Sequence, residues 1–349
     1  MPATAPAPHS SLEDMHPASF AMVMATGIVS IAAQLEGWSW LARALLAVNV
    51  PLYLLLWGLT AARVVRYPKR VRDDLLDHGR CMGFFTMVAA TCVLGNGFLV
   101  VVHWPAVAVA LWMLGIALWL VTTYTLLTLL TVKPVKPDLA TGINGGWLVA
   151  VVATQAVAVL GAFAAPYVNA SEVALFFALA IWLSGGILYV LIIVLIFYRY
   201  TFFVLAPSQL SPPYWINMGA MAISTLAGTA LIGAAEQSPL LGELLPFLKG
   251  FTLACWATAT WWIPLLLVLG AWRHLGWRVP LSYDVVYWSM VFPLGMYTAC
   301  TRRLSEVVDQ PWLAFIPRYF LIFAVAAWAV TALGLVRHLC RRPAAAPSH

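Results

Sequence analysis

Few side chains in this sequence are placed for acid, base, metal or redox chemistry. The seven histidines fall in predicted tails, loops or ends of apolar segments, and the five cysteines are scattered without a CxxC pair. This spacing provides neither a metal site nor a disulfide framework. The carboxylates lie at predicted boundaries or in loops, and we interpret the deepest, Glu236, as an interfacial residue rather than a coupling site. We therefore expect no enzyme activity, metal or cofactor.

The remaining candidates are weak ligands on single faces of apolar segments. Small and weakly polar residues recur there at helical spacing, and the candidates are Ser19, Thr26, Ser30, Thr86, Asn144 and Ser224. Two interpretations are open. Small residues permit close packing of helices in membranes, or the hydroxyls, amides and exposed backbone line a path that binds ions weakly.

The elements that position these residues are membrane-spanning helices. Hydrophobic residues make up 63% of the chain, charged residues 9%, and the mean hydropathy is +0.89, whereas soluble domains hold roughly a quarter charged residues. A bilayer core requires about 20 apolar residues per helix. Ten such spans are predicted, at about 17–35, 44–62, 82–102, 106–131, 143–164, 173–197, 214–235, 246–271, 284–301 and 313–336.

The spans alternate in character. Even-numbered spans are bulky and leucine-rich, as in the run from Leu52 to Leu56, whereas odd-numbered spans carry the small and weakly polar residues. This alternation predicts lipid-facing and interior helices. We therefore expect an all-α polytopic membrane protein in which ten transmembrane helices form five helical hairpins around a shared axis.

The distribution of Lys and Arg predicts the orientation. With the N-terminus in the cytoplasm, fourteen of the 19 basic residues lie inside and five lie outside, namely Arg43, Lys249, Arg302, Arg303 and Arg318. We expect one transmembrane domain, 17–337, between flexible tails over 1–16 and 338–349, with both termini cytoplasmic and the protein in the plasma membrane, or the inner membrane of a bacterium. The net charge of +6 is a topology signal facing anionic lipid rather than a nucleic-acid surface.

Two motifs carry a family resemblance. Residues 16–30 read HPASFAMVMATGIVS, and residues 287–297 read YWSMVFPLGMY. The first motif resembles the opening span of the tellurite-resistance/dicarboxylate transporter family, and the second is similar to its ninth span. This family includes slow anion channels of plants, sulfite exporters of yeast and malate permeases.

The resemblance implies a quasi-fivefold bundle whose odd-numbered helices line a central pore, assembled as a homotrimer with one pore per protomer. It also implies that Phe292 is the gate and that Met296 lines the pore. An aromatic ring in a narrow neutral tube expels water and forces an ion to shed hydration. Pro293 removes a backbone donor and is expected to kink the helix. The alternative role for Phe292 is packing against a neighbouring helix.

The expected function is passage of small anions, either inorganic ions such as chloride, nitrate or sulfite, or C4-dicarboxylates. The alternative is a proton-coupled carrier of a C4-dicarboxylate such as malate. Basic residues near the mouths, Arg80 and Arg278 inside and Arg302 and Arg303 outside, either concentrate anions or anchor the helices at the interface. The expected partners are small anions and the lipid bilayer.

Overall fold

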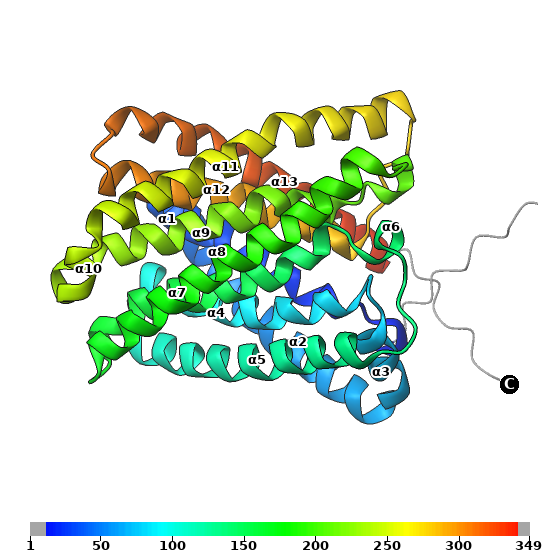
Figure 1. Ribbon diagram of the computed structural model, residues 1–349, viewed down its shortest axis with the longest axis horizontal. Coiled ribbons are helices and arrows are strands. Elements are labelled where there is room, and N and C mark those ends of the chain that lie inside the picture. The colour runs from blue at the N-terminus through cyan, green and yellow to red at the C-terminus, as the bar shows by residue number, and fades with distance from the viewer. Residues whose placement is uncertain (1–11, 341–349) are drawn as a thin grey trace, which may run out of the picture.

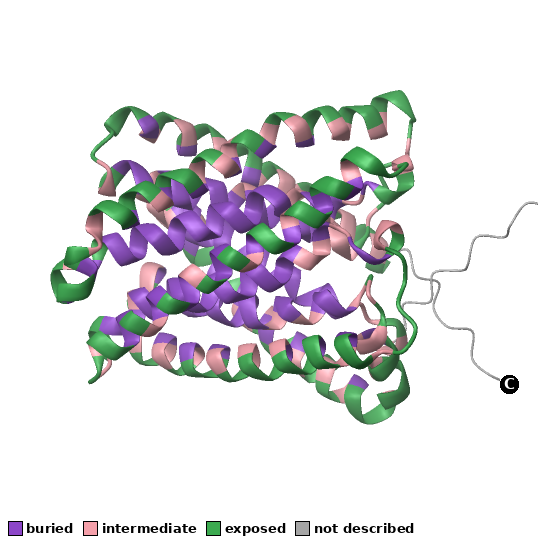
Figure 2. Ribbon diagram, in the orientation of Figure 1, coloured by how far each residue is buried: buried purple, intermediate pink, exposed green. Residues whose placement is uncertain are grey.

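Five nearly buried helices form the centre of the molecule. The computed structural model describes residues 12–340, and within that range the central helices are α1 (Ala21–Leu35), α4 (Phe85–Val101), α7 (Val149–Ala164), α9 (Ile216–Gly233) and α12 (Trp288–Val307). Each packs against the next in chain order, and α12 packs against α1 to close the ring. Figure 2 shows this centre in purple.

Five longer helices surround the ring. They are α2 (Ser39–Arg66), α5 (Pro105–Val132), α8 (Ser171–Phe202), α11 (Leu245–Ala271) and α13 (Phe315–Cys340). Each packs on the inner helix that precedes it and contacts the one that follows, with α13 reaching α1. The predicted arrangement of five helical hairpins around an axis is therefore confirmed (Figure 1).

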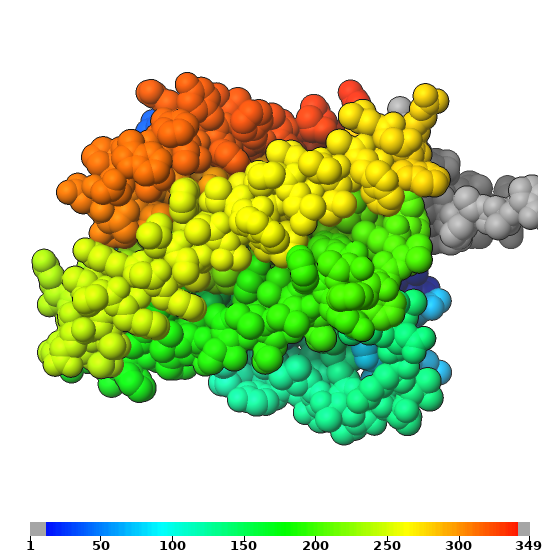
Figure 3. All heavy atoms as spheres, turned by 45° about the horizontal axis from the view of Figure 1, so that its top comes forward, coloured from blue at the N-terminus to red at the C-terminus, as the bar shows by residue number. Residues whose placement is uncertain are grey.

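The outer helices present apolar side chains to the surroundings. Leu54 of α2, Val190 of α8 and Leu267 of α11 are each more than half exposed, and Figure 3 shows the side covered by α8 (green) and α11 (yellow). Nine of the described helices, short flanking turns included, are long and apolar enough to cross a membrane. The protein is thus a multi-pass membrane protein.

The ninth predicted span, α12, is less apolar than the other nine. The sequence predicts it over 284–301, but the helix runs over Trp288–Val307 and includes Arg302, Arg303 and Glu306. Ion pairs from both arginines to Glu306 stabilise this last turn. Hydropathy alone places the end of the span too early because it treats charged residues as loop.

The two ends of the bundle differ in charge. Twelve described Lys and Arg residues, from Arg63 to Arg337, lie at what we call the basic end, where α3 (Pro68–Leu76), α6 (Leu139–Gly142) and the π-helical turn η9 (Trp272–Gly276) are found. The opposite end, called the far end, carries Arg43, Lys249, Arg302, Arg303 and Arg318, and the short helix α10 (Pro239–Glu243). All five inner helices run from the basic end to the far end, so their dipoles are parallel.

Every inner helix starts with a short 3-10 turn at the basic end. The turns are η2 (Pro17–Phe20), η3 (Cys81–Phe84), η4 (Gly145–Leu148), η7 (Pro212–Trp215) and η10 (Val285–Tyr287), and they contact one another in a closed ring. The ring is packed backbone to backbone. A methyl group on Gly83 would lie 2.7 Å from the Ala18 nitrogen, and one on Gly145 would lie 2.5 Å from the Pro213 oxygen.

We expect Gly145→Ala to destabilise the protein by about 2 kcal/mol or more, because the added methyl meets backbone atoms that cannot rotate away. The matched control is Gly250→Ala in α11, where no atom lies within 4 Å of the added methyl; its effect should stay within about 0.5 kcal/mol. Unfolding of the purified variants in detergent measures both. Equal stability of the two variants would contradict the tight ring of 3-10 turns.

The described chain ends pack more extensively than the predicted tails suggest. Residues 12–14 form the 3-10 turn η1 (Leu12–Asp14), whose Glu13 carbonyl accepts hydrogen bonds from Arg63 of α2. The helix α13 continues to Cys340, three residues beyond the predicted domain boundary. The other tail residues, 1–11 and 341–349, lie outside the described residues.

Candidate functional site

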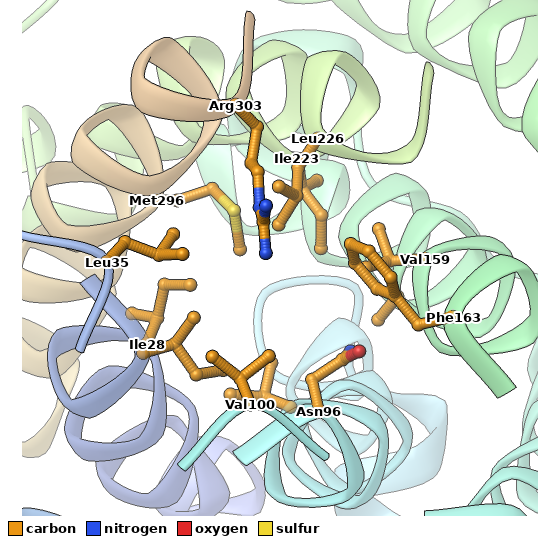
Figure 4. Close-up of a pocket in the computed structure, with 13 residues that line it drawn as sticks. Ile28, Leu35, Asn96, Val100, Val159, Phe163, Ile223, Leu226, Met296 and Arg303 are labelled. Carbon is orange, nitrogen blue, oxygen red and sulfur yellow. The ribbon is translucent and has the colours of Figure 1, made fainter. Parts of the chain in front are cut away.

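An internal cavity lies on the bundle axis and is lined by all five inner helices (Figure 4). Its volume is about 20 Å³, room for roughly one water molecule. The walls are mostly aliphatic. The lining residues are Ile28, Ile31 and Leu35 of α1, Val93, Asn96 and Val100 of α4, Ala156, Val159 and Phe163 of α7, Ile223 and Leu226 of α9, and Met296 and Arg303 of α12.

The lining repeats with one spacing. In α1, α4 and α7 it consists of residues i, i+3 and i+7, and α9 and α12 supply parts of the same pattern. Residues at this spacing share one helical face. The cavity therefore follows the quasi-fivefold axis, and equivalent positions can be compared between helices.

Two polar side chains reach this cavity from opposite sides (Figure 4). Asn96 donates a hydrogen bond from Nδ2 to the Cys92 carbonyl at 3.1 Å, and its buried Oδ1 has no hydrogen-bond partner. Arg303 extends from the last turns of α12, and its guanidinium points back into the cavity. This direction agrees with the tilt of helical side chains towards the helix N-terminus.

A second hollow of about 190 Å³ lies at the far end. Its lining includes Thr229, Gln237 and Glu306, and it shares Phe163 and Arg303 with the axial cavity. The guanidinium carbon of Arg303 lies 5.9 Å from the centre of the Phe163 ring, and Arg303 Nη1 lies 3.2 Å from Glu306 Oε2. The side chains of Phe163 and Arg303 thus lie between the hollow and the axial cavity.

The predicted gate residue, Phe292, is 1% exposed. It lies four residues before Met296, so it occupies the same face of α12, one turn nearer the basic end. On each of the other four inner helices, we take the residue four positions before the first one that lines the cavity. These residues are Met24, Ala89, Val152 and Gly219. The ring is the one aromatic side chain in this layer of five.

Pro293 lies inside α12, which continues as a helix on both sides of it. A methyl group on Gly219 of α9 would lie 2.7 Å from Pro293 Cγ. The glycine thus makes room for the proline ring at this helix contact. The kink at Pro293 stays a prediction.

The predicted lining residues are only partly brought together. Met296 lines the axial cavity, but the six polar candidates do not. The Thr26 hydroxyl accepts a hydrogen bond from Trp328 of α13, and the Ser30 hydroxyl donates one to the Ala42 carbonyl of α2. Ser224 donates to the Ala220 carbonyl within its own helix. The Thr26 and Ser30 bonds join neighbouring helices, whereas the Ser224 bond does not.

The other three candidates lie near the 3-10 turns at the basic end. Ser19 donates to the His16 carbonyl, Thr86 donates to the Gly83 carbonyl, and Asn144 Oδ1 accepts from the Gly146 N–H at the start of η4. A pore-lining role for these residues and for Thr26, Ser30 and Ser224 stays a prediction.

A buried charge cluster holds the basic end together. Asp74 of α3 binds Arg63 Nη2 at 2.7 Å and Arg80 Nε at 2.6 Å, and the Arg63 and Asp74 side chains are 6% and 9% exposed. His16 caps η2 by accepting the Ala18 N–H through Nδ1. Burial, with the nearby positive charge of Arg80, lowers the pKa of His16 to about 4, so this cap is neutral at pH 7.

Among residues 12–340, no group of three or more His, Cys, Asp or Glu side chains is placed to hold a metal ion. Cys81, Cys92, Cys255 and Cys300 are buried separately in the bundle, as expected for small apolar residues.

The fold and the axial cavity define a class of membrane protein in which parallel helices surround one central path. Comparison with known families agrees. A family model for voltage-dependent anion channels matches residues 14–336, and the chain belongs to that family. It is thus an anion transporter or channel, and the resemblance of its first and ninth spans is confirmed.

Curated relatives cover much of the chain. An uncharacterized transporter of Methanocaldococcus jannaschii is 25% identical over 336 residues, 92% of this chain and 94% of that one. A sulfite efflux pump of Trichophyton rubrum is 23% identical over 343 residues, covering 92% and 89%. An uncharacterized membrane protein of Mycobacterium tuberculosis is 36% identical over 152 residues, covering 44% and 77%.

Proposed function

We propose that the protein is a passive pore for small anions that is closed by Phe292. The observation that carries this proposal is the layer next to the cavity, in which Phe292 is the one aromatic side chain and the equivalent positions of the other inner helices hold Met24, Ala89, Val152 and Gly219. Two of these four residues, Ala89 and Gly219, are small and leave space for the ring. An aromatic ring there blocks the path and expels water from it.

The electrostatics of the path favour anions. The N-terminal ends of five parallel helices meet at the basic end, and such ends carry partial positive charge. Arg303 lies at the other end of the cavity in a solvent-accessible ion pair with Glu306, and the described lining of the axial cavity itself contains no carboxylate. The mostly aliphatic walls offer few polar ligands, so an anion is bound weakly and can leave as readily as it enters.

We propose sulfite as a substrate, with chloride, nitrate and C4-dicarboxylates as competitors. The support is the fungal sulfite efflux pump that aligns with 92% of the chain. The alternative mechanism is a proton-coupled carrier for a C4-dicarboxylate such as malate. A carrier of this kind needs a group that binds and releases a proton during transport.

Flux measurements in proteoliposomes distinguish the two mechanisms. Liposomes that contain the purified protein are loaded with sulfite, chloride, nitrate or malate. The flux of each anion is recorded with and without a proton ionophore. We expect flux to follow the electrochemical gradient of the anion and to persist when the proton gradient is collapsed. Flux that is confined to malate and stops with the ionophore would favour the carrier.

The orientation and assembly extend the proposal. We place the basic end in the cytoplasm because Lys and Arg accumulate on that side of membrane proteins, with the protein in the plasma membrane or the bacterial inner membrane. Leu12, residues 14–16 and residues 338–339 line one shared pocket at this end, so the described chain ends lie on the same side. The homotrimer implied by the family resemblance stays a prediction.

A further inference from the structure

Arg303 occupies a position that the other inner helices give to apolar residues. Its equivalents in the repeated lining are Leu35, Val100 and Phe163. A charge in such a wall is costly unless it has a partner. Hydrophobic packing alone therefore does not account for an arginine at position 303.

The partner of Arg303 holds it loosely. The Arg303 and Glu306 side chains are 34% and 41% exposed, and ion pairs this accessible contribute at most about 1 kcal/mol. Arg302 competes for the same carboxylate, at 3.1 Å from Glu306 Oε1. An anion arriving through the outer hollow can thus replace Glu306 at small cost.

The Phe163 ring fixes where the released guanidinium would act. It lies 5.9 Å from the guanidinium carbon and borders both hollows. A ring at this distance attracts a cation and keeps it at the junction of the two spaces. The donors of Arg303 are thereby held at the junction of the two hollows, which share Phe163 and Arg303 in their lining.

We propose that Arg303 forms an anion-binding subsite at the far end of the path, positioned by Phe163 and occupied by Glu306 when no anion is bound. The subsite favours oxyanions such as sulfite over halides, because the planar guanidinium fork binds two oxygens at once. This inference rests on the proposed function, since it assigns a binding step to the same path.

The test compares four variants by anion-dependent flux in proteoliposomes, both in the parent protein and in the Phe292→Ala background. Arg303→Gln should raise the half-saturating sulfite concentration about tenfold, the loss expected for one charge-assisted hydrogen-bonding group. Arg302→Gln is the matched control, because Arg302 pairs with the same Glu306 but lines neither hollow. Its half-saturating concentration should change less than about twofold.

Two further variants test the partner and the fork. Glu306→Gln removes the competing carboxylate and should lower the half-saturating sulfite concentration. Arg303→Lys keeps the charge without the planar guanidinium fork, so it should weaken the binding of sulfite more than the binding of chloride. This conservative variant also covers the case in which Arg303→Gln folds poorly.

The outcomes separate this inference from the proposed function. Anion flux with equal sulfite dependence in Arg303→Gln and Arg302→Gln would overturn the subsite but leave the pore intact. If Arg303→Lys raises the half-saturating concentrations of sulfite and chloride by the same factor, the oxyanion preference is overturned. Absence of anion flux from every folded variant and from the parent would overturn the proposed function and this inference with it.

Discussion

Replacing Phe292 with Ala should raise anion flux by about tenfold or more, because the change removes the ring that blocks and dewets the path. Phe292 is 1% exposed, and the equivalent positions of the other inner helices include the small residues Ala89 and Gly219. No neighbouring ring in that layer can take its place. The measurement is flux per reconstituted protein, with the parent and the variant in liposomes of one composition.

Loss of a buried ring also costs stability, typically about 3–5 kcal/mol, so a matched control is needed. Phe20 is equally buried, but its ring packs edge-on against Trp57 and Tyr53 of α2, away from the axis. Phe20→Ala should lose comparable packing without a rise in flux. If Phe292→Ala is folded and conducts no more than Phe20→Ala, the ring is a packing residue.

Replacing Asp74 with Ala should destabilise the basic end by about 3–5 kcal/mol, because it leaves two arginines without their shared carboxylate. The cluster joins α2, α3 and the start of η3 beside the N-terminal residues. The apparent free energy of unfolding in detergent measures the effect.

The matched control for this cluster is the Arg70–Glu13 pair, whose side chains are 57% and 35% exposed. Arg70→Gln should change the free energy of unfolding by less than about 1 kcal/mol. Similar small changes in both variants would mean that solvent screens the buried cluster as well as the surface pair.

Hydropathy and the alternation of small and bulky spans were sufficient to predict the architecture. Bilayer thickness fixes span length, and lipid-facing helices need no small residues, so both signals reflect the fold directly. The ends were less predictable. The predicted span 44–62 becomes the helix α2, Ser39–Arg66, because terminal turns continue as helix among polar and basic residues.

The polarity of the side chains did not predict which face of each inner helix is turned towards the axis. Ile28 faces the axis while Thr26 faces Trp328 of α13, since a hydroxyl in a membrane finds its partner in a neighbouring helix. The wall of the cavity is as apolar as the helix contacts. A sequence signal does exist in the shared spacing of Ile28–Ile31–Leu35, Val93–Asn96–Val100 and Ala156–Val159–Phe163, but it becomes readable only once the ring defines equivalent positions.

The direction of the Arg303 side chain could not be predicted from the sequence. Its place near the outer mouth was predicted, but the path of its side chain was not. The sequence does not reveal that the guanidinium turns back along α12, meets Phe163 of a distant helix and reaches the axial cavity. The helices α7 and α12 are not neighbours in the ring, so this geometry depends on how the whole ring closes, and no local pattern encodes it.

The most direct test of the central claim is the zero-current potential of Phe292→Ala across a bilayer with a gradient of one anion and its accompanying cation. Anion passage along the axis predicts that the potential lies near the equilibrium potential of the anion and moves with it when the anion is exchanged. A potential near that of the cation, or a conductance no different from the parent, would contradict a phenylalanine-gated anion path.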